Sequence, residues 1–128
     1  MKKTAIFIIV LLLLGLYATY NSLFPKADKI NYPDYSQVES ITASTNGEVF
    51  DLSQEECRVL YNCIRKAKPT RKMSANDTPD VKNYWNINIE ADSLPFRYGY
   101  IYEIGGKTYF EIPYVGIYSL DLSWLDHN

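Results

Sequence analysis

Residues 84–120, YWNINIEADSLPFRYGYIYEIGGKTYFEIPYVGIYSL, contain the clearest strand pattern in this chain. Apolar and polar residues alternate over 84–91 and again over 96–104, as they do in strands that bury one face. Gly105-Gly106 then turns the chain into a further strand, 107–112, and a short break separates this strand from a last extended segment. The pattern predicts an antiparallel meander.

A hairpin is expected upstream of the meander. Asn46-Gly47 separates two runs of strand character, 41–45 and 48–52. This dipeptide tolerates the positive φ angles of a two-residue hairpin turn.

A helix is expected to begin after Ser53, because Ser53 and Glu56 have the spacing of a capping box. Pro69 ends it. Its apolar residues recur at spacings of three and four and predict one buried stripe: Cys57, Leu60, Ile64 and Ala67. The predicted fold class is α+β, with one helix packed on an antiparallel β meander and a signal or anchor helix in front.

Residues 1–22 have the features of an export signal. Lys2 and Lys3 precede an unbroken apolar run, 5–16. The positive-inside bias keeps the lysines in the cytoplasm and places the rest of the chain outside. A cleaved signal peptide and a membrane anchor through residues 5–20 both stay open, because the run is near the lower length limit of a span.

The remaining chain divides into an extended tether, 23–38, and a single extracytoplasmic α+β domain, 39–128. Without Lys2 and Lys3, this part has 11 basic and 15 acidic residues. A general nucleic-acid-binding protein would be basic, so we expect no nucleic-acid partner.

Cys57 and Cys63 are six residues apart in the predicted helix. This spacing corresponds to a rise of about 9 Å, more than the ~7 Å between Cα atoms that a disulfide tolerates. We therefore expect two thiols, with Cys57 buried in the stripe and Cys63 on a different face.

Two polar segments could contact a ligand. The loop 74–80, SANDTPD, has the residues of an Asx-turn, and it lacks the ligand spacing of a calcium loop. A basic run could contact anionic lipid headgroups or wall polymers, or could be a solvated helix end: Arg65, Lys66, Lys68, Arg71 and Lys72.

Several tyrosines predict either a sheet face that stacks a sugar or peptide, or cross-strand packing: Tyr98, Tyr100, Tyr102, Tyr109, Tyr114 and Tyr118. Glu90, Glu103 and Glu111 fall on three predicted strands and could form an acid/base pair only if they converge. The sole histidine, His127, is next to the last residue, which disfavours catalytic triads and histidine zinc sites. We expect no catalytic residues, no metal and no cofactor.

Two motifs carry a family resemblance. The first is Ser74-Ala75-Asn76-Asp77-Thr78-Pro79, and the second is Pro113-Tyr114-Val115-Gly116-Ile117-Tyr118, with the Gly106-Lys107 hairpin between them. Residues 53–120 resemble a small uncharacterised extracytoplasmic domain family of Gram-positive bacteria with the pattern Ser-Val-Asn-Asp-x-Pro, Gly-Lys, Gln-Pro-Tyr-x-Gly-Ile-Tyr. Ile112 replaces the glutamine of that pattern.

The resemblance implies export and the fold, and the family has no assigned activity. Similar domains behind membrane-bound sensors of the β-lactam-receptor type imply a sensing or binding role.

The sequence favours a non-catalytic, envelope-associated domain that binds a protein, peptide or cell-wall component through Asn76, Asp77, Tyr114 and Tyr118. A carboxylate-dependent hydrolase is one alternative, and a concave pocket with two carboxylates about 5–9 Å apart would favour it. A membrane-held inhibitor or immunity-type protein is another, and it differs from the binding domain only in its partner.

Overall fold

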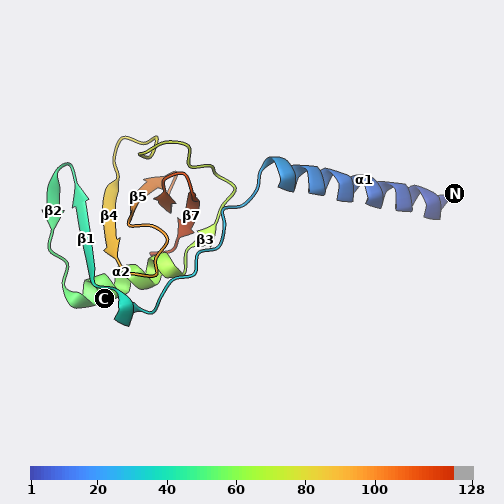
Figure 1. Ribbon diagram of the computed structural model, residues 1–128. Helices are drawn as coiled ribbons and strands as arrows, with labels where there is room; N and C mark the ends of the chain where they lie inside the picture. Colours follow the sequence, from blue (N-terminus) through green and yellow to red (C-terminus); the bar gives the residue numbers. More distant parts are fainter. Residues whose placement is uncertain (123–128) are drawn as a thin grey trace.

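The computed structural model describes residues 1–122, and His127 lies outside them. It contains two α-helices, a 3-10 turn and a seven-stranded antiparallel sheet (Figure 1). The predicted α+β class and the apolar N-terminal helix are therefore confirmed. The elements are α1 (Lys2–Leu23), η1 (Tyr35–Gln37), β1 (Ser40–Thr45), β2 (Glu48–Phe50), α2 (Gln54–Arg65), β3 (Lys68–Pro69), β4 (Trp85–Glu90), β5 (Tyr98–Ile104), β6 (Lys107–Ile112) and β7 (Gly116–Leu120).

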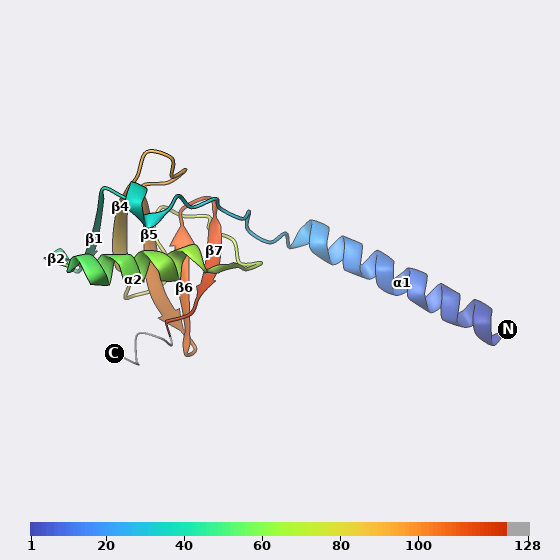
Figure 2. The same ribbon diagram turned by 90° about the horizontal axis from the view of Figure 1, so that it is seen from below.

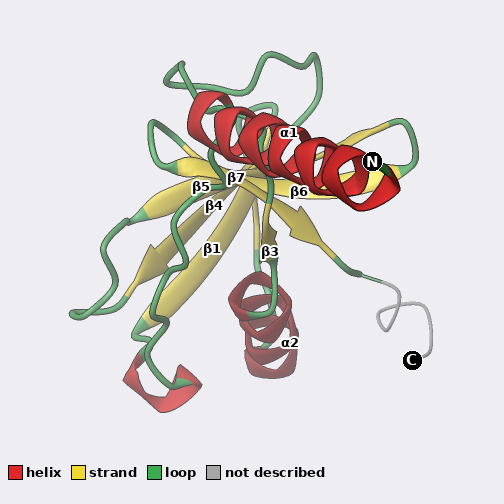
Figure 3. Ribbon diagram, turned by 90° about the vertical axis from the view of Figure 1, so that its right-hand side faces the viewer, coloured by secondary structure: helices red, strands yellow, loops and turns green. Residues whose placement is uncertain are grey.

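The strands lie in the order β2-β1-β4-β5-β6-β7-β3. Strands β4 to β7 form the predicted meander, and the hairpin of β1 and β2 adds to its β4 side. Helix α2 lies on one face of the sheet and connects β2 at one edge with β3 at the other (Figure 3). Strand β3 was not predicted, since it has two residues and pairs with β7 far along the chain.

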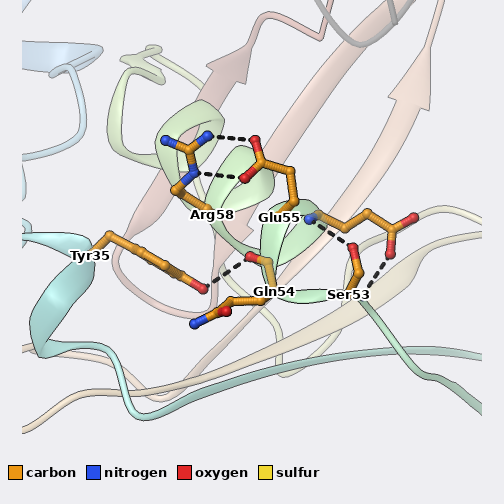
Figure 4. A network of polar contacts seen from close by, with 6 residues as sticks. Tyr35, Ser53, Gln54, Glu55 and Arg58 are labelled. Carbon is orange, nitrogen blue, oxygen red and sulfur yellow. Dashed lines mark hydrogen bonds and ion pairs between the residues drawn. The ribbon is translucent and has the colours of Figure 1, made fainter.

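Local sequence rules account for the hairpin and the start of α2. Asn46 and Gly47 have φ angles of 51° and 81°, which confirms the two-residue turn. The Ser53 hydroxyl accepts from the Glu56 amide at 3.2 Å, and the Glu56 carboxylate accepts from the Ser53 amide at 2.7 Å. Figure 4 shows this capping box beside the Glu55–Arg58 ion pair, with the Tyr35 hydroxyl donating to the Gln54 carbonyl.

The predicted stripe of α2 packs on the core, with Ile64 fully buried and Cys57, Leu60 and Ala67 partly buried, but the two cysteines differ from the prediction. Cys63 is buried and Cys57 is only half-buried, the reverse of what we expected, and no disulfide joins them. Tyr61 is also fully buried, and its hydroxyl donates to the Pro33 carbonyl at 2.6 Å. Ile64 is therefore at the middle of the buried face of α2, and Tyr61 and Cys63 are at its two sides.

Both faces of the central strands are covered. The face under α2 packs a core of these buried residues: Ile41, Ala43, Tyr61, Cys63, Ile64, Ile87, Ile89, Phe110, Ile112, Tyr118 and Leu120. The opposite face, called here the tyrosine face, buries Tyr100, Tyr102, Tyr109 and Ile117. Val81 and Tyr84, from the long loop between β3 and β4, pack against these residues.

The segment between α1 and β1 contributes to the core, a role that its sequence does not suggest. We call residues 24–38 the strap. Five of its side chains pack against the core under α2: Ala27, Ile30, Tyr32, Tyr35 and Val38. Irregular backbone has no periodic pattern, so these contacts cannot be recognised in the sequence.

Helix α1 projects away from the domain, as Figure 2 shows. It has 22 residues, contains an 18-residue window with a mean hydropathy of 2.1, and has no residue buried in the protein. Its length and composition are sufficient for a membrane span.

Gly99 is expected to be essential for packing under α2. A Cβ atom at this position would lie 2.4 Å from Cζ of the buried Phe110 ring. The substitution Gly99→Ala should lower the free energy of unfolding by about 1–3 kcal/mol through overpacking, measured by urea unfolding of the full chain in detergent. Thr42→Ala, at an exposed position of β1, is the control, and equal midpoints for the two variants would contradict the steric argument.

Candidate functional site

The candidate site begins with a buried carboxylate on the tyrosine face. Glu111 on β6 is 5% exposed, and within residues 1–122 it is the only charged residue that is buried. The Ser74 hydroxyl donates to one carboxylate oxygen at 2.6 Å, and the Tyr102 hydroxyl donates to the other at 2.9 Å. These donors stabilise a charge whose burial without partners would cost several kcal/mol.

Ser74 connects this carboxylate to the turn between β6 and β7. Its hydroxyl oxygen accepts from the Tyr114 amide at 3.2 Å, and the Tyr114 hydroxyl donates to Asp77 at 2.8 Å. Tyr114 has a φ angle of 61°, and such a conformation costs a residue other than glycine about 1–3 kcal/mol. Two hydrogen bonds thus hold Tyr114 in a strained backbone conformation while its side chain stays exposed.

The surroundings keep the tyrosine hydroxyls protonated. The hydrogen bond to Asp77 raises the pKa of Tyr114. Burial, followed by the hydrogen bond to Glu111, raises the pKa of Tyr102. Burial also raises the pKa of Tyr100, with smaller contributions from neighbouring groups that include Asp77 and Glu111. The hydroxyls of Tyr102 and Tyr114 donate to Glu111 and Asp77, respectively.

Exposed residues extend from this cluster. Tyr114 is 65% exposed and Val115 is 49% exposed. Tyr98, at the beginning of β5, is 41% exposed and contacts the Tyr100 ring at a centroid distance of 5.9 Å. We call the following set the Asp77–Tyr114 surface: Asn76, Asp77, Tyr98, Tyr114 and Val115.

The structure brings together some of the predicted binding residues. Asp77 and Tyr114 are hydrogen-bonded, and Asn76 is exposed beside Asp77. Tyr118 does not join them, because it lies in the core under α2 and its hydroxyl donates to the Asp28 carbonyl. The prediction did not include Ser74, whose place in the first motif was a signal that it has a role.

The three strand carboxylates do not converge. Glu111 pairs across strands with Tyr100, whereas Glu103 is three residues further along β5 and faces the opposite side of the sheet. Glu90 is exposed, at the end of β4 that pairs with Ser40 of β1. Within residues 1–122, no group of three or more histidine, cysteine, aspartate or glutamate side chains could hold a metal ion.

The basic run separates into different contacts. Arg65 forms an ion pair with Asp34 at 3.5 Å. Arg71 donates to the Phe24 carbonyl and the Asn21 side chain at the end of α1. Lys72 lies over the Tyr109 ring, with its ammonium nitrogen 5.4 Å from the centroid.

The substitution Ser74→Ala should loosen the loop that covers the tyrosine face. It leaves Glu111 with one donor and removes the acceptor of the Tyr114 amide. We expect the free energy of unfolding to fall by about 1–3 kcal/mol and amide exchange in residues 74–84 to accelerate. Ser119→Ala, at an exposed position of β7, is the control. Unchanged exchange in Ser74→Ala would show that this hydroxyl does not hold the loop.

Alkaline pH should destabilise the fold through its tyrosines. In the unfolded chain tyrosines ionise near pH 10, whereas Tyr100, Tyr102 and Tyr114 have raised pKa values in the folded protein. Above pH about 10 the unfolded state binds fewer protons than the folded state. The contribution of these tyrosines to the free energy of unfolding is therefore complete below this pH and is lost as the pH rises further. Urea unfolding at increasing pH measures this loss. Stability that stays constant up to the alkaline limit of the assay would contradict it.

Comparison with known protein families matches residues 26–119 to the family DUF5301, described as "Domain of unknown function (DUF5300)". No curated protein and no solved structure matches the chain. The match begins inside the strap and ends in β7, and so includes every residue of the Asp77–Tyr114 surface. The chain belongs to the DUF5301 family of domains of unknown function.

Proposed function

We propose that this chain is a membrane-anchored, extracytoplasmic, non-catalytic module that binds a protein or peptide through the Asp77–Tyr114 surface. Helix α1 supports the anchor, because it is long and apolar enough to cross a bilayer. Lys2 and Lys3 in front of its apolar residues favour the orientation with the domain outside.

The observation that carries the binding proposal is the conformation of Tyr114. A strained residue persists only when its surroundings determine it, and such residues cluster at functional sites. Hydrogen bonds from Tyr114 to Ser74 and Asp77 fix the turn, yet the side chain is 65% exposed and covers little of the domain itself. The strain therefore serves to present the ring to solvent.

The composition of the surface favours a protein or peptide ligand. Exposed tyrosines are enriched at protein interfaces, because they bury a large apolar area and keep a polar hydroxyl available. Tyr98 and Tyr114 supply such rings, and Asp77 and Asn76 supply polar groups beside them. A cell-wall polymer could also stack on these rings, and the experiment below distinguishes it.

The environment of Glu111 supports a non-catalytic role. A general acid or base has to reach the substrate, whereas this carboxylate is buried and both its oxygens accept hydrogen bonds from Ser74 and Tyr102. An inhibitor or immunity-type protein would use the same surface, and only the identity of the captured partner separates it from other binding modules.

Photo-cross-linking of the full chain in its native membrane tests this proposal. A benzophenone amino acid in place of Tyr98 should cross-link one partner, and a second substitution, Tyr114→Ala, should weaken capture by about 30-fold, the effect of losing an interface hot spot. Ile104→Ala, at an exposed apolar position near the other end of β5, is the matched control. Circular dichroism checks the fold of each variant.

Two results would contradict the proposal. Equal capture by the Tyr114→Ala and Ile104→Ala variants would show that the Asp77–Tyr114 surface does not bind the partner. Cross-links that disappear after digestion of the cell wall would identify a polymer as the ligand in place of a protein.

A further inference from the structure

The strap is fixed to the sheet beside β7. The Ala27 amide donates to the Thr70 carbonyl at 3.0 Å, and the Thr70 amide donates to the Ile117 carbonyl at 3.0 Å. A Cβ atom on Gly116 would lie 2.3 Å from Cβ of Ala27, so the glycine is required for this close approach. The chain is therefore attached to the domain only a few residues after α1 ends.

Arg71, in the loop after β3, forms hydrogen bonds with the C-terminal end of α1. Its guanidinium donates to the Phe24 carbonyl and the Asn21 side chain, and it lies 4.8 Å from the centroid of the Tyr20 ring. A cation at the C-terminus of a helix also complements the helix dipole. Figure 2 shows the loop after β3 reaching toward this end of α1.

These contacts place exposed aromatic and apolar residues, together with several cations, at the level where α1 would leave a bilayer. Tyr20, Phe24 and Met73 are exposed by 49%, 52% and 76%. Residues 20–30 and 70–73 together contain four cations and one carboxylate. Aromatic and apolar side chains with neighbouring cations are typical of protein segments in the headgroup layer.

We propose that a membrane-facing surface, formed by Tyr20, Phe24, Lys26, Arg71, Lys72 and Met73, lies in the headgroup layer of the outer leaflet and binds anionic lipids. The Met73 side chain enters the layer beside α1, and the exposed lysines contact the headgroups. This inference rests on the anchor in the proposed function and is independent of the protein ligand.

Fluorescence quenching in vesicles tests the proposal with the full chain. The variants Met73→Trp and Val49→Trp each add one tryptophan to the same background, and Val49 is 70% exposed on β2, at the edge of the sheet opposite β3. Brominated lipids should quench the tryptophan added in Met73→Trp, and more strongly when the vesicles contain phosphatidylglycerol than when they are phosphatidylcholine alone. The tryptophan added in Val49→Trp should be unaffected.

Removing one cation, by Lys26→Gln or Lys72→Gln, should weaken the lipid-bound orientation by about fivefold and reduce quenching of the tryptophan added in Met73→Trp. Equal quenching of the tryptophans added in Met73→Trp and Val49→Trp would overturn the proposal. Because reconstitution places α1 in the vesicle whatever its fate in cells, release of the domain from cell membranes would refute the anchor in the proposed function without changing this measurement.

Discussion

The hydrogen bonds that Ser74 and Tyr102 donate to the buried Glu111 carboxylate organise the candidate site. The two carboxylate oxygens need donors, and one donor, Ser74, comes from the long loop between β3 and β4. Meeting this requirement attaches the loop to the sheet, and the attached loop covers the tyrosine face with Val81 and Tyr84. The same Ser74 hydroxyl accepts from the Tyr114 amide. Through Ser74, the Glu111 carboxylate is therefore linked both to the loop that covers the tyrosine face and to the turn that carries Tyr114.

Close approaches at two glycines determine how other parts of the fold pack. Two glycines permit packing that any side chain would block: Gly99 accommodates the Phe110 ring, and Gly116 accommodates Ala27 of the strap. Tyr118, two residues after Gly116 on β7, donates to the Asp28 carbonyl from the core under α2. The Pro-Tyr-x-Gly-Ile-Tyr motif thus serves two purposes, since its first tyrosine forms the exposed turn and its glycine and last tyrosine hold the strap.

Local signals made the strands of the meander, the Asn46-Gly47 hairpin and the capping box of α2 predictable, because each depends on neighbouring residues. Residues whose roles depend on distant partners were placed wrongly or missed. Tyr118 was expected beside Tyr114, but Tyr114 lies in the turn before β7, whereas Tyr118 is a residue of β7 whose side chain lies in the core under α2. The role of Ser74 depends on Glu111, which is 37 residues away in the sequence. The sequence pattern therefore predicted Asp77 and Tyr114 as binding residues, but it did not predict that Glu111 is linked to Tyr114 through Ser74.

A fixed strap limits what a domain on a membrane can reach. A flexible linker would allow the domain to sample a volume that grows with linker length, but here the chain is bound to the sheet at Ala27 and to the end of α1 through Arg71. The turn that carries Tyr114 is next to Gly116, which packs on Ala27. With α1 in a bilayer, as proposed above, these contacts would keep the Asp77–Tyr114 surface close to the headgroups. If the surface binds a partner, as we propose, a partner that is itself held at the membrane would meet it at high effective concentration, whereas a partner further out would not.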